Sequence, residues 1–342
     1  MSITKKPFGV TRGGEAVFEY TIEDGGAYVS VITYGAAVTK IVVPDRGGEL
    51  RDVTLGYDKL EEYEASGSVF GALCGRVANR IANGEFTLNG GKYALERNAF
   101  PHHLHGGAGG FHRRVWESEV RGGALILSRV SPGGEEGYPG TLETSARFAF
   151  ADGRLTIATD VRSDADTVAN IVNHSYFNLN GHGAGNILRH RLKIGADAYC
   201  ETDGTALVRG VAPAPVAGTP LDFRGFHEIG ERIDADFPQT AQVRGYDHNF
   251  ALNGSGMRAA AEAAGDVSGI TLTVSTDLPG IQLYTANYMR ERGKGGAEYN
   301  ARAGFCLEAQ YFPNAVNVPE YESPVLRAGE TRTRTVSYAF SA

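Results

Sequence analysis

Four segments place titratable or hydrogen-bonding side chains inside sequence that otherwise favours strands or tight turns. They are residues 100–107, with three histidines in four positions, residues 170–179, residues 245–250 and residues 304–310. In the last, period-two alternation puts Phe305, Leu307 and Ala309 on one face and Glu308 on the other. A carboxylate in so apolar a strand is costly unless it is partnered or faces a cleft. These positions are therefore candidates for acid–base or binding chemistry.

Each segment also has a structural interpretation. A histidine in an apolar strand is usually a hydrogen-bonded structural residue, Glu308 could belong to a buried ion pair, and Asp247 could cap a turn. His103 and His105 have the spacing of a cupin metal site, but such sites use a glutamate shortly afterwards. Here the residues after His105 read Gly-Gly-Ala-Gly-Gly. A metal site is thus the weaker alternative.

The elements that must position these residues read as short strands. Alternating apolar and polar residues predict strands at the ranges 28–34, 124–127, 155–159, 270–274 and 333–338. Turn dipeptides such as Asp24-Gly25, Asn89-Gly90 and Asp152-Gly153 separate such runs.

Helix signals are few. One or two turns are expected between Asp58 and Ala65, and Phe226, Ile229 and Ile233 share a helical face. Residues 258–264 are rich in alanine, yet a glycine-bounded turn and a clear strand follow, so we expect a hairpin arm. With no linker, repeat or long helix, the sequence predicts one all-β domain, a large antiparallel sandwich over residues 1–342.

Composition excludes several classes of protein. The 342 residues include 46 glycines, roughly twice the usual share, and 33 basic against 40 acidic residues give a net charge of −7. Nucleic acid and anionic membranes are therefore poor partners. The three cysteines form no C-x-x-C pair, and we find no secretory signal, no run of apolar residues long enough to span a bilayer, no phosphate-binding loop and no G-x-S-x-G elbow. We expect a cytoplasmic protein.

Taken together, the segments resemble the aldose 1-epimerases, also called galactose mutarotases. The resemblance is carried by Gly-Arg-Val-Ala-Asn-Arg-Ile (75–81), Leu-His-Gly-Gly (104–107), Asn-His-Ser-Tyr-Phe-Asn-Leu (173–179), Tyr-Asp-His-Asn-Phe (246–250) and Phe-Cys-Leu-Glu-Ala-Gln (305–310). Residues 131–140 and 279–284 extend it. The motifs follow the family's order and spacing over essentially the whole chain.

The resemblance implies roles for individual residues. Glu308 takes the position of the general base, His174 that of the general acid, and His105 that of a second active-site histidine. Contacts to sugar hydroxyls are implied at the following residues: Asn79, Arg80, His105, Ser175, Tyr176, Asp247 and Gln282. The implied fold is the family's large antiparallel supersandwich with the site in an open cleft. The implied enzyme is an isomerase for free aldoses such as galactose or glucose, working as a monomer or homodimer.

The chemistry of this family needs no cofactor or metal. A base removes the proton of the anomeric hydroxyl while an acid protonates the ring oxygen, each contributing roughly 10²–10⁴-fold. We expect His174 to be largely protonated near neutral pH, favoured by a carboxylate such as Asp247. His102, His103 and His112 depart from the family's pattern, which predicts an altered pocket rim and a permissive enzyme.

Two alternatives remain at this point. A glycoside hydrolase could use Asp247 and Glu308 as its carboxylate pair, but the His174 and His105 motifs would then have no role. A non-catalytic sugar-binding protein could keep Asn79, Arg80 and Asp247 without an acid or base. This chain has both, which favours an enzyme.

Overall fold

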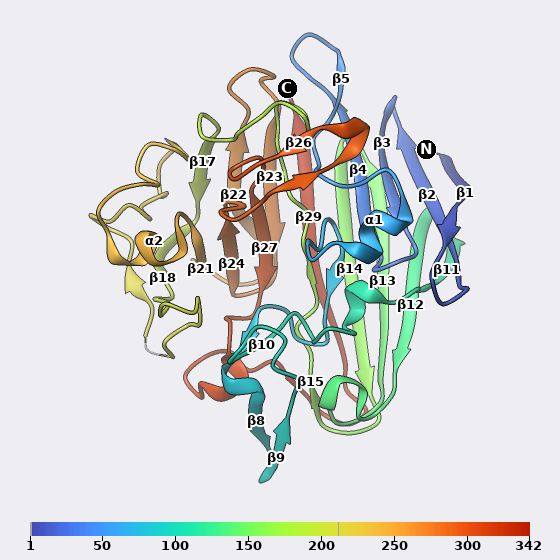
Figure 1. Cartoon of the computed structure of the whole chain (residues 1–342), viewed down its shortest axis with the longest axis vertical. Helices are drawn as coiled ribbons and strands as arrows, with labels where there is room; N and C mark the ends of the chain where they lie inside the picture. Colours follow the sequence, from blue (N-terminus) through green and yellow to red (C-terminus); the bar gives the residue numbers. More distant parts are fainter. Residues whose placement is uncertain (1, 211) are drawn as a thin grey trace.

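Three antiparallel sheets dominate the computed structural model, which describes residues 2–210 and 212–342 (Figure 1). The first contains, in spatial order, β1 (Ser2–Val10), β2 (Ala16–Asp24), β3 (Ala27–Ile32), β4 (Ala37–Pro44) and β5 (Leu50–Asp52). The second and largest contains β11 (Glu117–Arg121), β12 (Ala124–Ser131), β13 (Leu142–Ala151), β14 (Arg154–Ser163), β29 (Thr331–Ser341), β23 (Thr271–Thr276), β22 (Arg258–Ala264), β17 (Arg191–Ile194) and β20 (His227–Glu228). The third contains β19 (Ala214–Pro215), β18 (Ala196–Tyr199), β21 (Asp247–Leu252), β24 (Gly280–Tyr284) and β27 (Cys306–Gln310).

Short elements connect and cover these sheets. Two-stranded pairs join β6 (Leu73–Cys74) to β16 (Val172–Asn173), β7 (Arg80–Ile81) to β10 (His103–Leu104), β8 (Glu85–Leu88) to β9 (Gly91–Ala94), β15 (Thr167–Val168) to β28 (Val325–Leu326) and β25 (Glu291–Arg292) to β26 (Glu298–Tyr299). The helices are α1 (Leu60–Ala65), α2 (Pro238–Val243) and single 3₁₀ turns at Ala82–Gly84, Phe111–Arg113, Glu135–Gly137, Lys294–Gly296 and Ala315–Asn317. Within the described residues, no helix is long and apolar enough to cross a membrane.

The sheets pack because their alternating strands each present one apolar face. In β13 and β14 every second residue is buried, including Phe148, Phe150, Leu155 and Ile157. These side chains share one core cluster with residues of the first and third sheets, and β2 packs against β12 and β13. The outcome is the all-β sandwich that the sequence predicts, with the third sheet beside the large one (Figure 1).

The expected elements mostly form, with one exception. The alanine-rich segment is strand β22, as expected, because Ala260, Ala261 and Ala263 enter the core between β17 and β23. The helix expected around Phe226, Ile229 and Ile233 is wrong. Those residues enclose β20, and Ile229 donates its backbone N–H to His190, so sheet pairing replaces the helical bonds.

Candidate active site

A cavity of about 310 Å³ gathers most of the predicted site residues. Its walls contain Asn79, Arg80, His105, His174, Tyr176, Asp247 and Glu308, and its lining is completed by Gly67, Ser68, Val69, Leu104, Tyr284, Tyr288 and Met289. The wall residues come from segments up to 229 positions apart (308 − 79). The antiparallel packing brings them together.

The third sheet supplies the carboxylates. Glu308 lies on β27 opposite Gln282 of β24, and Asp247 at the start of β21 lies opposite Tyr284. Phe305, Leu307 and Ala309 join the main core, as their alternation predicts. Glu308 therefore points the other way and is only 2% exposed at the cavity wall.

His174 and Tyr176 follow strand β16 and share a face, as period two predicts. Their rings stack with centroids 5.0 Å apart. The backbone at His174 is fixed on both sides, because its N–H donates to Ala72 and its carbonyl accepts from Gly71. The imidazole is therefore held rigidly over the cavity, with 4% of the residue exposed.

Two loops pack against each other and so fix the positions of Asn79 and His105. Both residues have left-handed backbone conformations, with φ of 60° and 51°. Gly106 is required at the contact, because its φ is +83° and a Cβ there would lie 1.8 Å from the carbonyl oxygen of Gly75. The Leu-His-Gly-Gly motif thus packs directly on the Gly-Arg-Val-Ala-Asn-Arg loop.

This contact also fixes the tautomer of His105. The backbone N–H of Asn79 donates to Nδ1 of His105 at 3.2 Å, so the proton of the neutral ring must be on Nε2. Burial lowers the pKa of His105 well below its usual value, and His174, His112 and Arg80 lower it further. His105 is consequently a neutral hydrogen-bond donor, with its ring centroid 5.2 Å from that of His174.

The shortest contact between an acid and a base in the cavity joins His174 and Glu308. Nε2 of His174 lies 3.5 Å from Oε2 of Glu308, and this carboxylate oxygen has no hydrogen-bond partner among the described residues. Burial raises the pKa of Glu308 well above its usual range, and Asp247 raises it further. Burial lowers the pKa of His174 to about 4.

The expectation that His174 is largely protonated near neutral pH is therefore wrong for the sugar-free site. The desolvation of a fully buried imidazole dominates, and the Asp247 charge does not reverse it. The two groups together hold one proton, because burial favours the neutral form of each.

Asp247 is set up to accept hydrogen bonds from a ligand. Gln282 donates to one of its oxygens, Oδ1, at 2.7 Å, and Gln310 in turn donates to Gln282 at 3.3 Å. Burial raises the pKa of Asp247, and the Arg80 charge opposes that rise. Gln282 thus fixes the position of the Asp247 carboxylate, although Gln282 itself does not line the cavity.

Ser175 faces away from the cavity. Its hydroxyl donates to Asn173 at 2.7 Å, and Asn173 donates to the carbonyl of Gly71 at 2.8 Å. The same alternation that aims His174 and Tyr176 at the cavity turns Ser175 to the opposite face. Ser175 is therefore not among the residues that line the cavity, and its contact with a sugar stays a prediction from the resemblance.

The three unusual histidines do not form the rim. His103 is fully buried, with Nδ1 on the carbonyl of Glu96 and Nε2 on the Tyr138 hydroxyl, both at 2.7 Å. His102 bonds to Asn83 and Thr205, and His112 lies beneath the rim beside Tyr34 and Tyr63. Because both nitrogens of His103 are occupied, the cupin-type site with His105 is not supported. Sequence reasoning gave no role to three further residues that line the cavity, Tyr284, Tyr288 and Met289; Tyr284 ends the 279–284 motif, and Tyr288 is 57% exposed.

One group of buried side chains beside the cavity could hold a metal ion. Ligand atoms of His174, Cys306 and Glu308 lie within 4.8 Å of one another. However, Nδ1 of His174 faces the thiol and Nε2 faces the carboxylate. The thiol and the carboxylate thus contact different ring nitrogens of His174, although the three ligand atoms are close enough together for a metal. The absence of a metal cofactor stays a prediction.

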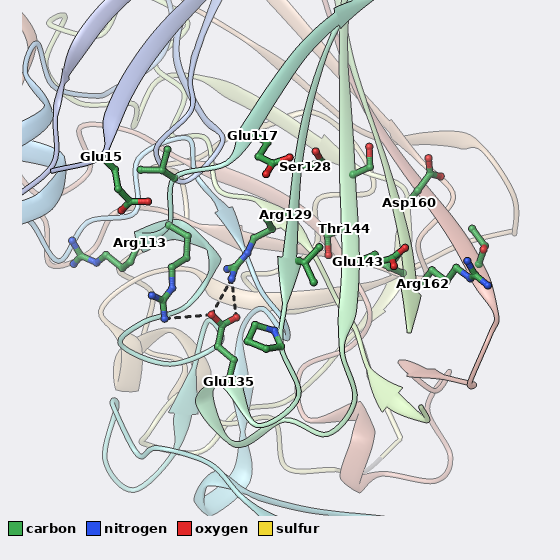
Figure 2. Close-up of a pocket in the computed structure, with 17 residues that line it drawn as sticks. Glu15, Arg113, Glu117, Ser128, Arg129, Glu135, Glu143, Thr144, Asp160 and Arg162 are labelled. Atoms are coloured by element: carbon green, nitrogen blue, oxygen red, sulfur yellow. Dashed lines mark hydrogen bonds and ion pairs between the residues drawn. The ribbon is translucent and has the colours of Figure 1, made fainter. Parts of the chain in front are cut away.

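A larger groove of about 750 Å³ lies elsewhere, over β12, β13 and β14 (Figure 2). Its central charges neutralise each other, because Arg129 donates to both oxygens of Glu135 at 2.9 Å. Glu135 also accepts from Ser131, next to the buried Arg76. The groove thus borders a structural network.

Arg76 is the hub of that network. The residue is 2% exposed and donates to the carbonyls of Ser131, Pro132, Pro139 and Gly140, each at 2.8 Å. These bonds tie the 131–140 loop to the loop that carries Asn79 and Arg80. The 75–81 and 131–140 motifs are therefore in direct contact through Arg76.

Several known proteins are similar to this chain in sequence and in structure. The model of the aldose 1-epimerase family matches residues 19–339. Galactose mutarotase of Rattus norvegicus is 40% identical over all of this chain and 99% of its own, and aldose 1-epimerase of Escherichia coli is 32% identical over 93% of each. Among solved structures, an aldose epimerase homologue from C. elegans superposes with a TM-score of 0.88 at 28% identity, covering 94% of this chain and 98% of its own. Galactose 1-epimerase from Lactobacillus acidophilus gives 0.87 at 27% identity, covering 99% and 98%.

Proposed function

The chain belongs to the aldose 1-epimerase family, and on that premise we propose that Glu308 and His174 interconvert the α and β anomers of a free aldose in the cavity described above. The enzyme is an isomerase. The observation that carries the assignment of these two residues is their contact, with Nε2 of His174 3.5 Å from Oε2 of Glu308 at the cavity wall.

The proton balance of the reaction matches a pair that holds one proton. Glu308 takes the proton of the C1 hydroxyl, His174 gives the proton on Nε2 to the ring oxygen O5, and the C1–O5 bond breaks. The pair begins as carboxylate and imidazolium and ends as carboxylic acid and neutral imidazole. After the C1 carbonyl turns by half a rotation, closure returns both protons and gives the other anomer.

Burial helps because it brings these two states closer in energy. In water, a carboxylate and an imidazolium are much the more stable form of such a pair. The raised pKa of Glu308 and the lowered pKa of His174 remove that preference. Proton transfer is most efficient when donor and acceptor affinities are matched in this way.

The remaining wall residues hold the sugar and its developing charge. His105 presents a fixed Nε2–H donor, which is suited to the C1 carbonyl oxygen of the open-chain sugar. Arg80, Asn79 and Asp247 offer charged or polar groups for the other hydroxyls, and Tyr176 lines the cavity with its ring stacked on that of His174. Gln282 supports Asp247, and Ser175 supports the His174 segment through Asn173.

Polarimetry of freshly dissolved α-galactose, α-glucose, xylose and arabinose tests the proposal. The enzyme should speed the approach to anomeric equilibrium for at least one of them, with galactose and glucose as the leading expectations. Methyl α-galactoside has no anomeric hydroxyl, so it offers Glu308 no proton to remove and should be inert. Release of methanol from it would instead support the glycosidase alternative, and acceleration of no free sugar would contradict the proposal.

Three further properties stay predictions from the sequence. They are a cytoplasmic location, a monomeric or homodimeric state, and catalysis by one domain without a cofactor.

A further inference from the structure

The imidazole of His174 has a second partner that the reaction scheme does not use. Its Nδ1 lies 3.6 Å from the sulfur of Cys306, whereas the contact with Glu308 is made by Nε2. Cys306 is two positions before Glu308 on strand β27, and it is fully buried. One strand therefore holds both partners of the imidazole.

We propose that Cys306 is a positioning residue for the acid, accepting a hydrogen bond from Nδ1–H of His174 so that the other nitrogen, Nε2, is the one that exchanges a proton with the sugar. The proposal rests on the proposed function of His174. A histidine that gives its Nε2 proton to O5 keeps its Nδ1 proton throughout, so it needs an acceptor at Nδ1 in both states. The side chain that contacts Nδ1 is this thiol, and a hydrogen bond to the backbone of His174 itself also acts on the ring.

Sulfur is a weak hydrogen-bond acceptor, and this limits its effect on the acidity of His174. Histidines in active sites are commonly oriented by a carboxylate or carbonyl at the second nitrogen, which stabilises the imidazolium. A thiol is a weak acceptor and carries no charge. Burial and the nearby carboxylates Glu308 and Asp247 raise the pKa of Cys306, which keeps the thiol protonated. Cys306 therefore orients the ring while stabilising the imidazolium less than a carboxylate would.

Few other groups around His174 can titrate in the working range. His105 and His112 are held neutral by burial, Tyr176 and Cys74 have raised pKa values, and the remaining facing charges are Glu308, Asp247 and Arg80. A change in the acidic limb of the pH profile on altering Cys306 thus reports on His174 itself.

The test compares Cys306→Ala with Cys74→Ala, a matched control. Cys74 is also fully buried and close to Glu308, but it has no hydrogen bond to His174 among the described residues. ¹⁵N-histidine NMR, assigned with His174→Asn, reads the tautomer of His174, and polarimetry over a pH series reads kcat. The tautomer is measured without any sugar, so the outcome is separable from the proposed function. Acceleration by the wild type tests that function by itself.

In wild type and Cys74→Ala, the neutral imidazole should carry its proton on Nδ1. In Cys306→Ala the Nε2–H tautomer should appear, kcat should fall roughly 10-fold, and the acidic limb should move to lower pH, because the imidazolium has lost an acceptor. Cys306→Ser, which restores an acceptor, should recover the Nδ1–H tautomer and part of kcat. The proposal is overturned if Cys306→Ala keeps the wild-type tautomer and acidic limb, or if both alanine variants change alike.

Discussion

His174 and Glu308 lie 3.5 Å apart, measured from Nε2 to Oε2, although 134 residues separate them in the chain (308 − 174). Both side chains are almost completely buried, at 5% and 3% exposure. Burial lowers the pKa of His174 to about 4 and raises that of Glu308. The usual order of the two pKa values is thereby reversed. The active form of the enzyme is then the pair with one proton.

The pH dependence of kcat/KM follows from this state. Below about pH 4 His174 gains a proton while Glu308 is already protonated, so no base remains and the rate falls. As pH rises through the raised pKa of Glu308, the pair loses its single proton and the acid disappears. We expect a bell-shaped profile whose alkaline limb belongs to Glu308, measured by polarimetry after pH jumps with the spontaneous rate subtracted. A profile with limbs at the usual values, near 4.3 and 6.5, would contradict the one-proton pair.

Replacing Asp247 by asparagine should move the alkaline limb to lower pH. The Asp247 charge is the second cause, after burial, of the raised pKa of Glu308, and the amide removes it. The same change should raise KM, because one acceptor for sugar hydroxyls is lost. Asp197→Asn, on a largely exposed side chain, is the control and should leave both quantities unchanged. An unmoved alkaline limb in Asp247→Asn would show that this limb does not belong to Glu308.

Arg76→Lys should destabilise the protein and also lower activity, although Arg76 does not line the cavity. Lysine cannot reproduce the planar fork that bonds four carbonyls of the 131–140 loop. Breaking such a buried network costs about 3–5 kcal/mol, and the Tm should fall by roughly 5 °C. Because the loop with Asn79 and Arg80 loosens, kcat/KM should fall as well. Arg121→Lys on the exposed β11 hairpin is the matched control. Equal melting temperatures for the two variants would count against the role of Arg76.

Exhaustive chelation should leave the rate unchanged. The nitrogens of His174 contact Cys306 and Glu308 directly, and the proton transfers proposed for this pair need no metal. Polarimetry before and after dialysis against a chelator, with metal analysis of the protein, checks this. A stoichiometric transition metal whose removal abolishes activity would contradict the cofactor-free reaction.

The sequence predicts some features because they depend on local rules. Period-two alternation correctly aims Glu308 away from the core face of β27, and correctly puts His174 and Tyr176 on one face. Applied consistently, it also turns Ser175 away from the cavity, which the motif-based assignment overlooked. The fold class follows from many short alternating runs without a long helix.

Other features depend on tertiary packing and could not be predicted in this way. Desolvation, which controls the charge of His174, depends on segments that the sequence does not place beside it. The rim residue Tyr288 comes from a loop with no pattern, whereas His103 turns inward to Glu96 and Tyr138. The apolar spacing at Phe226, Ile229 and Ile233 predicts a helix, but pairing of β20 with β17 overrides it.

The most direct test of the central claim is the turnover number of Glu308→Gln with freshly dissolved α-galactose, or with whichever free sugar the wild type turns over fastest. The amide keeps the size of the side chain but cannot take the C1 proton, so kcat should fall roughly 10²–10⁴-fold while sugar binding largely survives. His174→Asn should behave similarly, and the double variant should be little worse than either, because the two groups act as a unit. Near-normal turnover in a properly folded Glu308→Gln protein would contradict the assignment of Glu308 and His174 as the acid–base pair.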